Sequence, residues 1–289
     1  MEALFDILLK EGFWFAVIRS TTPILLTTLG AMIASRAGAR NIALEGTMLT
    51  AAFVGVAVSH FTQSAFVGLI FAVLSGIIMS NIIAYFALKL KSNIIISGIS
   101  LNLMASGMTV FGLYLLSINL PIIEDIPVIG RIISGHNILT YVALILVLLV
   151  WVMFKYTKLG LRIKAVGENP EAAESVGISV NQVKYIALTM SGALAALGGA
   201  FLSMGYVTLF SAGMTSGRGY IALATQAMAG ANPVVGLLTS SLFGFAESMS
   251  NYLQGAKLPI EFIQMLPYLA IVVIYVIYCA NKTKKENSL

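Results

Sequence analysis

The composition of this 289-residue chain excludes a soluble globular domain, because 58% of its residues are hydrophobic and only 10% are charged. Ordinary globular proteins carry about 25% charged residues, which they need for a surface that faces water. The formal net charge of +5 does not indicate a nucleic-acid partner, because the basic residues stand in short stretches beside long apolar runs. The composition therefore predicts an integral protein of a lipid membrane.

The apolar runs predict an all-α integral membrane protein of about nine transmembrane helices, within a range of eight to ten. A hydrocarbon core of about 30 Å needs about 20 apolar residues per helix. Residues 1–13 predict a short interfacial helix, and insertion of that helix would make ten spans. The run 217–230 is short enough to be a half-helix, so short or broken helices are expected. The expected spans are 14–34, 43–60, 65–88, 93–118, 138–156, 185–206, 217–230, 233–253 and 262–280.

The basic residues also predict an orientation. Arg36 and Arg40, Lys89 and Lys91, the stretch 155–184 and the stretch 282–285 all fall in alternate loops between the expected spans. Loops rich in Lys and Arg stay in the cytoplasm. We therefore expect an outer N-terminus and a cytoplasmic C-terminus in a single transmembrane domain over residues 1–289.

Catalytic and metal-site signals are missing from the sequence. His60, His136 and Cys279 stand alone, without partners at ligand spacing, so no metal site is expected. No phosphate-binding loop of the type Gly-x-x-x-x-Gly-Lys-Ser/Thr occurs, so the chain does not hydrolyse ATP by that route. No cofactor is expected, and a membrane enzyme is disfavoured. Energy for any transport must come from a partner or an ion gradient.

The long inner loop 157–184 contains the most informative motif. Its run Gly-Glu-Asn-Pro-Glu-Ala-Ala predicts a turn followed by a short helix, with Asn169 as its cap and Pro170 at its first position. A capped, charged helix in a cytoplasmic loop is suited to docking on a partner, although an ordinary solvated loop has the same composition. The expected coupling residues are Gly167, Glu168, Asn169, Pro170, Glu171, Ala172 and Ala173.

Two other blocks resemble each other and are candidates for a translocation path. Arg40-Asn41-Ile42-Ala43-Leu44-Glu45 and Arg218-Gly219-Tyr220-Ile221-Ala222-Leu223 both place an Arg shortly before Ile-Ala-Leu at an expected helix start. Repeated halves of transporters often place such helix ends beside the substrate. The path candidates are Asn41, Glu45, Gly219, Tyr220, Asn232, Pro233 and Glu247.

The path candidates also have structural interpretations. Glu45 could stabilise the N-terminus of its own helix, and Glu247 could pair with another helix. The break before Pro233 frees backbone groups that protein or water must satisfy. A stripe of small residues at Gly192, Ala195, Ala196 and Gly199 predicts close helix packing.

Three blocks in the expected order resemble ABC transporter permeases of the branched-chain amino acid, simple-sugar and nucleoside uptake family. They are the 167–178 run, the block Asn41-Ile42-Ala43-Leu44-Glu45-Gly46-Thr47-Met48, and Gly217-Arg218-Gly219-Tyr220 followed by Asn232-Pro233. The block with Glu45-Gly46 after Asn41-Ile42 and the block Gly217-Arg218-Gly219-Tyr220 look most like the nucleoside permeases that work with a basic-membrane-protein-type lipoprotein. The pair Thr225-Gln226 departs from the family pattern, where an apolar pair is usual.

The resemblance implies the permease subunit of an ATP-driven importer in a bacterial plasma membrane, most similar to those for nucleosides. The implied partners are an ABC ATPase that binds ATP, a second permease subunit in a heterodimer, and an extracellular substrate-binding lipoprotein. Simple sugars and branched-chain amino acids are the alternative substrates. A secondary transporter driven by an ion gradient is the less favoured alternative, because carboxylates within the spans are scarce.

Overall fold

A computed structural model describes residues 9–116, 135–207 and 209–254, together with 265, 268–269 and 275–276. Every regular element in these residues is a helix, which confirms the all-α prediction. The helices are α2 (Glu11–Arg36), α3 (Leu44–Thr62), α4 (Ala65–Ala84) with the π-helical turn η1 (Tyr85–Lys89), α5 (Ile94–Leu116), α6 (Ile138–Tyr156), α7 (Lys158–Glu168), α8 (Pro170–Ser175), α9 (Val180–Ala200) with the π-helical turn η2 (Phe201–Tyr206), α10 (Arg218–Ala229) and α11 (Pro233–Leu253).

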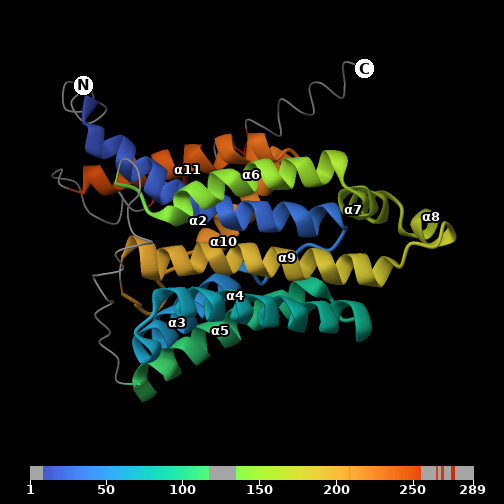
Figure 1. The fold of residues 1–289 in the computed structure, drawn as a ribbon, viewed down its shortest axis with the longest axis horizontal. Helices are drawn as coiled ribbons and strands as arrows, with labels where there is room; N and C mark the ends of the chain where they lie inside the picture. The colour runs from blue at the N-terminus through green and yellow to red at the C-terminus, as the bar shows by residue number, and fades with distance from the viewer. Residues whose placement is uncertain are drawn as a thin grey trace.

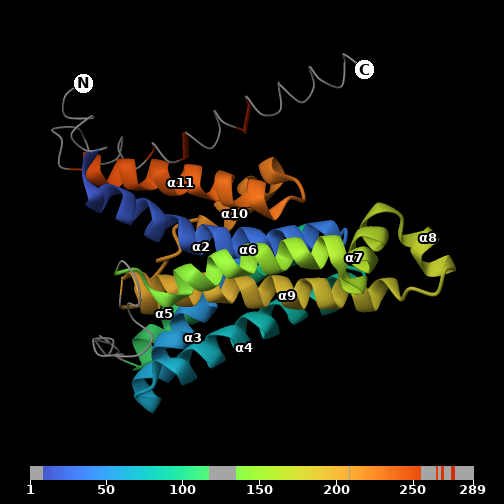
Figure 2. The same ribbon diagram turned by 45° about the horizontal axis from the view of Figure 1, so that its top comes forward.

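The long helices run side by side along the longest axis of the molecule, and α9 lies in the middle of the bundle (Figures 1 and 2). The short helices α7 and α8 project from one end. Within the described residues, six helices are long and apolar enough to cross a membrane: α2, α3, α4 with η1, α5, α6, and α9 with η2. The predicted spans from 14 to 253 each coincide with a helix to within a few residues, except that α9 begins five residues earlier than expected.

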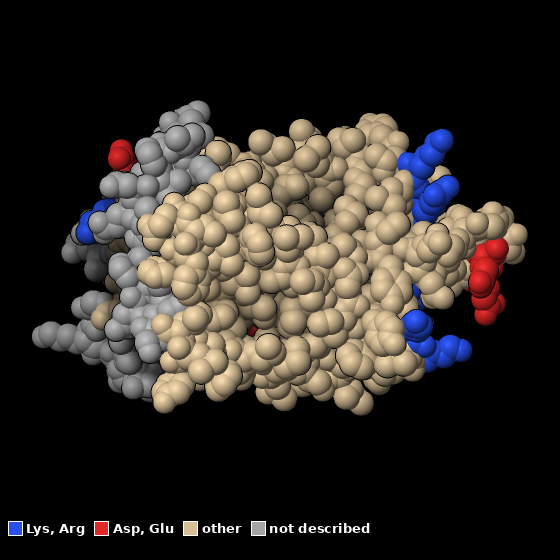
Figure 3. Space-filling model, turned by 60° about the horizontal axis from the view of Figure 1, so that its bottom comes forward, with Lys and Arg blue, Asp and Glu red and all other residues tan. Residues whose placement is uncertain are grey.

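Most exposed charges lie near the ends of the bundle. On the face shown in Figure 3, the broad middle carries almost no charged side chains apart from a small acidic patch in a hollow, basic side chains lie at the end with α7 and α8, and acidic side chains lie on the projection beyond it. Large apolar side chains cover the middle, including Leu103 and Phe111 on α5 and Leu148 on α6, which are 59–70% exposed. An uncharged band with exposed apolar side chains is typical of a surface that faces lipid.

The stripe of small residues on α9 brings three neighbouring helices into backbone contact. A Cβ atom added at Gly192 would lie 2.4 Å from the carbonyl oxygen of Gly76 on α4, and one at Gly199 would lie 2.1 Å from the carbonyl oxygen of Met48 on α3. Gly30 on α2 approaches the backbone of Ser191 as closely. The predicted close packing is therefore confirmed, and α9 joins α2, α3 and α4 into one core.

Some expectations lie wholly or mostly outside the described residues. The interfacial helix 1–13, the outer loop 119–137 and the ninth span 262–280 belong to this group. The first described helix, α2, begins at Glu11, within the stretch that was expected to lie in the interface.

We expect Gly192→Ala to destabilise the protein by about 1–3 kcal/mol, the usual cost of overpacking. The added methyl group would lie 2.2 Å from Ser80 Oγ and 2.4 Å from a backbone oxygen that cannot move freely. The measurement is the thermal midpoint of the purified protein in detergent. Gly107→Ala on α5 is the matched control, because no heavy atom lies within 4 Å of the new methyl group. Equal midpoints for the two variants would contradict the packing argument.

Candidate functional site

The helix α10 is too short to cross a membrane and begins inside the bundle. Its 12 residues extend about 18 Å, compared with about 30 Å of hydrocarbon. Its N-terminal flank is Gly217, whose φ of +77° lies in the left-handed region that favours glycine. A helix that begins inside a bundle leaves unpaired backbone N–H groups there, and these need an acceptor.

The carboxylate of Glu45 supplies that acceptor. Its Oε1 accepts a hydrogen bond from the Gly217 N–H at 2.8 Å, and its Oε2 accepts one from the Gly219 N–H at 2.7 Å. Its negative charge also complements the positive end of the α10 dipole. A Cβ at position 219 would lie 2.5 Å from the Glu45 backbone nitrogen, so this close approach requires glycine. The two blocks that resemble each other in sequence thus meet, and Glu45 caps α10 rather than its own helix.

A buried asparagine holds the same junction from a third helix. Asn102 on α5 accepts a hydrogen bond at its Oδ1 from the Gly46 N–H at 2.8 Å. Its Nδ2 donates to the Ile42 carbonyl and to the Tyr220 hydroxyl, both at 3.0 Å. Sequence reasoning did not single out Asn102. The available signal was an amide side chain in the middle of a span without any charged residue.

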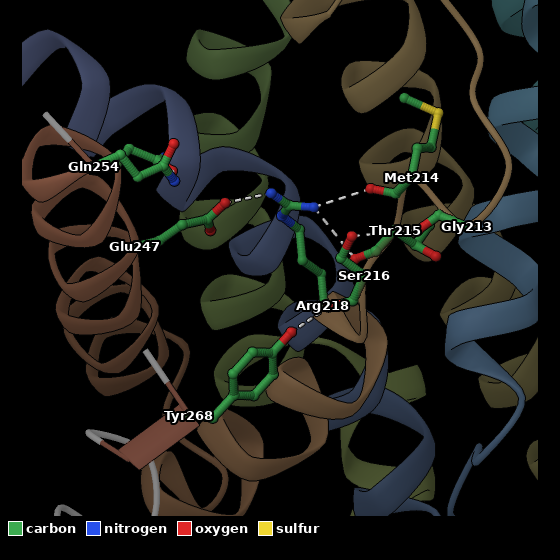
Figure 4. Close-up of polar contacts among 9 residues, drawn as sticks. Gly213, Met214, Thr215, Ser216, Arg218, Glu247, Gln254 and Tyr268 are labelled. Carbon is green, nitrogen blue, oxygen red and sulfur yellow. Dashed lines mark hydrogen bonds and ion pairs between the residues drawn. The ribbon is translucent and has the colours of Figure 1, made fainter. Parts of the chain in front are cut away.

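Beside this junction lies a largely buried ion pair between α10 and α11. Arg218 pairs with Glu247, and each side chain is only 15% exposed. Figure 4 shows the Arg218 guanidinium between the Glu247 carboxylate and the backbone carbonyls of Met214 and Thr215, to which Nη1 donates at 3.0 and 3.3 Å. Because both charges are compensated, the pair tolerates a site with little water. Glu247 was a candidate for the translocation path. The structure shows the alternative that was considered for it, in which its carboxylate pairs with another helix.

The ion pair lines a cavity of about 310 Å³ between α2, α10 and α11. This volume lies at the small end of the range for ligand pockets, and such pockets combine apolar walls with a few polar groups. In this cavity the charges of Arg218 and Glu247 cancel, and the aromatic residues Phe243 and Tyr268 also line it. The arrangement can therefore bind a small, neutral, polar molecule. The lining residues are Ile24, Ser216, Arg218, Ile221, Phe243, Glu247, Ser250, Asn251, Gln254 and Tyr268.

Three of the path candidates lie elsewhere. Asn41 is buried and donates from Nδ2 to Ser80 on α4 and to Ser191 on α9, both at 3.2 Å, so it joins two helices. Asn232 caps α11 by accepting from the Val234 N–H at 3.0 Å, and Pro233 is the first residue of that helix. Both lie at the α7–α8 end. The structure thus brings together Glu45, Gly219, Tyr220 and Glu247, but not the other three.

Thr225 and Gln226, the pair that departs from the family pattern, form hydrogen bonds from α10 to α2. Thr225 lies within hydrogen-bonding distance of Thr28, which also accepts from Ser240 on α11 at 3.3 Å. Gln226 donates to Ser35 at 3.2 Å. Two polar side chains thus replace apolar packing where the half-helix lies against α2.

The motif around Asn169 folds as the sequence predicts. Asn169 Oδ1 accepts from the Ala172 N–H at 3.0 Å, and Pro170 occupies the first turn of α8. Ala173 is buried, whereas Glu171 and Ala172 are exposed. The preceding helix α7 was not predicted, although Thr157 caps it by accepting from the Gly160 N–H at 3.1 Å.

Gly167 fixes this segment to the transmembrane bundle. A Cβ at this position would lie 1.9 Å from the carbonyl oxygen of Arg36, the last residue of α2, so the two backbones are in contact. Val166 and Ala173 are buried in the same apolar cluster as Ala37 and Ala229. The α7–α8 segment is therefore packed against both the end of α2 and the end of α10, while the acidic side chains of α8, Glu171 and Glu174, are exposed.

A family model described as the permease component of the branched-chain amino acid transport system matches residues 13–277. The chain belongs to this permease family. The matched range covers the half-helix α10, the ion pair and the α7–α8 segment, and it confirms the resemblance drawn from the three sequence blocks. Together with the six apolar helices, it makes the permease a multi-pass membrane protein.

The permease is similar to transporter permeases of other organisms over most of its length. It is 32% identical to the nucleoside ABC transporter permease protein NupC of Lactococcus lactis, with 89% of each chain covered. It is 33% identical to the putative glucose ABC transporter permease protein TsgC13 of Haloferax volcanii, with 86% of this chain and 80% of the relative covered. Its fold is similar to a chain of PsaBC from Streptococcus pneumoniae, with a TM-score of 0.56 at 18% identity, covering 96% of this chain and 95% of the other.

We expect Glu247→Leu alone to destabilise the permease by about 3–5 kcal/mol, because it leaves the Arg218 charge buried without a partner. The double variant Arg218→Met with Glu247→Leu removes both charges and should recover most of this loss. The thermal midpoints of the two single variants and the double variant, measured in detergent, form a double-mutant cycle. A double variant whose loss equals the sum of the single losses would show that the two charges are not coupled.

Proposed function

We propose that this permease is the membrane-spanning subunit of an ATP-driven importer for nucleosides. The observation that carries the substrate class is the 310 Å³ cavity, which combines a neutralised ion pair with the half-exposed aromatic ring of Tyr268. A nucleobase offers a flat face for an aromatic ring, and its amide-like edge suits both a carboxylate acceptor and a guanidinium donor. The similarity to NupC supports the same class.

The orientation follows from the charge at the ends of the bundle. Basic side chains gather at the α7–α8 end (Figure 3), and such an end faces the cytoplasm in a plasma membrane. In this orientation the N-terminus is outside, residues 157–184 are a cytoplasmic coupling loop, and a ninth span at 262–280 brings the C-terminus into the cytoplasm. Residues 1–289 form a single permease domain.

Coupling to ATP uses the α7–α8 segment as a lever. The exposed face of α8, with Glu171 and Ala172, docks on a separate ATPase subunit, which binds the ATP. Its buried face shares an apolar cluster with Ala229 at the end of α10. The opposite end of α10 carries Arg218 at the cavity. A displacement of α8 is thus transmitted along a single half-helix to the ion pair that lines the proposed substrate site.

The remaining partners complete an importer. A second, related permease subunit forms a heterodimer with this one, and an extracellular lipoprotein delivers the nucleoside at the end opposite α8. The permease itself requires no metal or cofactor. The rival substrates are simple sugars, which the similarity to TsgC13 favours, and branched-chain amino acids. An ion-coupled secondary transporter is the rival mechanism.

We expect Glu171→Lys and Pro170→Gly to uncouple ATP hydrolysis from uptake without blocking membrane insertion. The first reverses a charge on the exposed face of α8, and the second loosens its first turn at the Asn169 cap. The measurement is nucleoside uptake together with ATPase activity in proteoliposomes that contain the whole complex. Glu168→Lys should have the same effect.

Lys91→Glu is the matched control for charge reversal, because Lys91 is exposed between α4 and α5 and lies outside the α7–α8 segment. It should leave the ratio of uptake to ATP hydrolysis unchanged. Full coupled transport by the Glu171→Lys and Pro170→Gly variants would contradict the proposed lever. Uptake by the permease in liposomes without any ATPase would instead favour the ion-coupled mechanism.

We expect unlabelled guanosine, but not ribose or leucine, to suppress uptake of labelled guanosine by the whole complex. Ribose lacks the base that the Tyr268 ring would contact, and leucine carries charges that the neutralised cavity does not match. Tyr268→Ala, which removes the exposed ring from the cavity wall, should weaken guanosine competition by about 5–150-fold, as expected for the loss of about 1–3 kcal/mol of stacking. Competition by ribose at least equal to that by guanosine would assign the permease to sugars.

A further inference from the structure

A second cavity, of about 380 Å³, lies at the α7–α8 end, beyond the end of α10 that is opposite to the proposed substrate site. It is formed by the ends of α2 and α6, the second half of α7 and the start of α11. No Asp or Glu side chain lines it within the described part of the chain. The lining residues are Arg36, Trp151, Phe154, Lys155, Lys164, Ala231, Asn232 and Pro233. We call it the basic cavity.

Within the described residues, the positive charge of the basic cavity is balanced only in part. Arg36 Nε is buried and has no hydrogen-bond partner there. Lys155 makes cation–π contacts, with its Nζ 4.8 Å from the Trp151 ring centroid and 5.1 Å from that of Tyr156. Lys164 contacts Glu168 at 3.9 Å in a solvent-exposed pair of little strength. Three cations thus lie around one hollow that no carboxylate of the described residues lines.

The start of α11 adds to this field. Asn232 and Pro233, the cap and first residue of this 21-residue helix, both line the basic cavity. The N-terminus of a long helix carries about half a positive charge, and its free N–H groups bind phosphate and carboxylate groups. A helix N-terminus and three cations, one with an unpaired buried N–H, together make a site for an anion.

The surroundings favour a lipid over a soluble anion. The cavity contains Trp151 and lies at the last turn of α6, close to Tyr156, and Trp and Tyr are enriched at the depth of lipid headgroups. The preceding turns of α6 expose Ile145, Leu148 and Leu149, each more than half exposed. A phosphate in the basic cavity would therefore leave acyl chains against an apolar helix face. We propose that the basic cavity binds the phosphate group of an anionic phospholipid.

The tryptophan content of the chain permits a direct test. It has two tryptophans, and Trp14 stands 22 residues before Arg36 on α2, about 33 Å from the cavity end of that helix. In the full-length Trp14→Phe protein, fluorescence therefore reports Trp151 alone. We expect brominated phosphatidylglycerol in mixed micelles to quench it at an about fivefold lower mole fraction than brominated phosphatidylcholine.

Removing charge from the basic cavity should abolish this preference. In Lys155→Gln with Lys164→Gln, both exposed positions that leave the core intact, the two lipids should quench at nearly equal mole fractions. The matched control, Lys89→Gln with Lys91→Gln, removes two charges from the same end outside the basic cavity and should keep the preference. Arg36→Gln should also reduce it. A preference that survives the cavity variant, or that the control loses equally, would overturn the proposal.

A soluble phosphate is distinguished by competition. Inorganic phosphate should not displace phosphatidylglycerol any better than chloride at the same ionic strength, because it lacks acyl chains to bind the face of α6. Full relief of quenching by inorganic phosphate would overturn the lipid assignment and leave a site for a soluble anion. The test does not require transport, so its outcome is independent of the nucleoside proposal.

Discussion

The architecture depends on how the buried N-terminus of α10 is satisfied. A half-helix that starts inside an apolar bundle exposes several N–H groups to surroundings that hold little water, where an unsatisfied polar group costs several kcal/mol. Glu45 accepts from two of these groups with both carboxylate oxygens. In return, the two N–H donors and the helix dipole compensate the negative charge of the carboxylate. Neither partner is stable in this position without the other.

This mutual dependence makes α10 a separate unit within the permease. One end is held by Glu45 and carries Arg218 at the cavity, and the other end packs with the α7–α8 segment through Ala229. Along its length, Thr225 and Gln226 contact α2 through hydrogen bonds. Hydrogen bonds between hydroxyl and amide groups can be exchanged for others with little change in energy, whereas interlocked apolar side chains cannot. The polar contacts of Thr225 and Gln226 therefore constrain the position of α10 against α2 less strictly than interlocked apolar side chains would.

The sequence predicted local features well and long-range partners poorly. Apart from α7 and the start of α9, the ends of the helices from residue 44 to residue 253 follow from charges, prolines and capping side chains that are neighbours in sequence, as Asn169 and Pro170 show. The acceptor role of Glu45 depends on N–H groups 172 residues away, and any residue type carries such groups. Glu45 and Gly219 could therefore be predicted as candidates for the translocation path, but their contact with each other could not be predicted. Asn102 was overlooked for the same reason.

The helix α7 was missed because its charged residues were taken as an approach to the motif. Its apolar positions, Ile163 and Val166, are spaced three apart and face the bundle, while the charged positions face outward. The Gly167 contact with Arg36 was also beyond prediction, since the requirement for glycine comes from the backbone of another helix. Pairing of Arg218 with Glu247 likewise required knowledge of how α10 and α11 lie together.

The glycine contacts of α9 hold several helices of the permease at a fixed spacing. Where two helices touch backbone to backbone, as at Gly192 and Gly199, no side chain can change its rotamer to allow sliding. The helix α11 is held to α2 in the same way, because a Cβ at Gly244 would lie 2.9 Å from the Thr21 nitrogen and 2.9 Å from the Val17 carbonyl oxygen. A bundle fixed in this way keeps a constant outline in the membrane, so the surrounding lipid packs against a surface of constant shape.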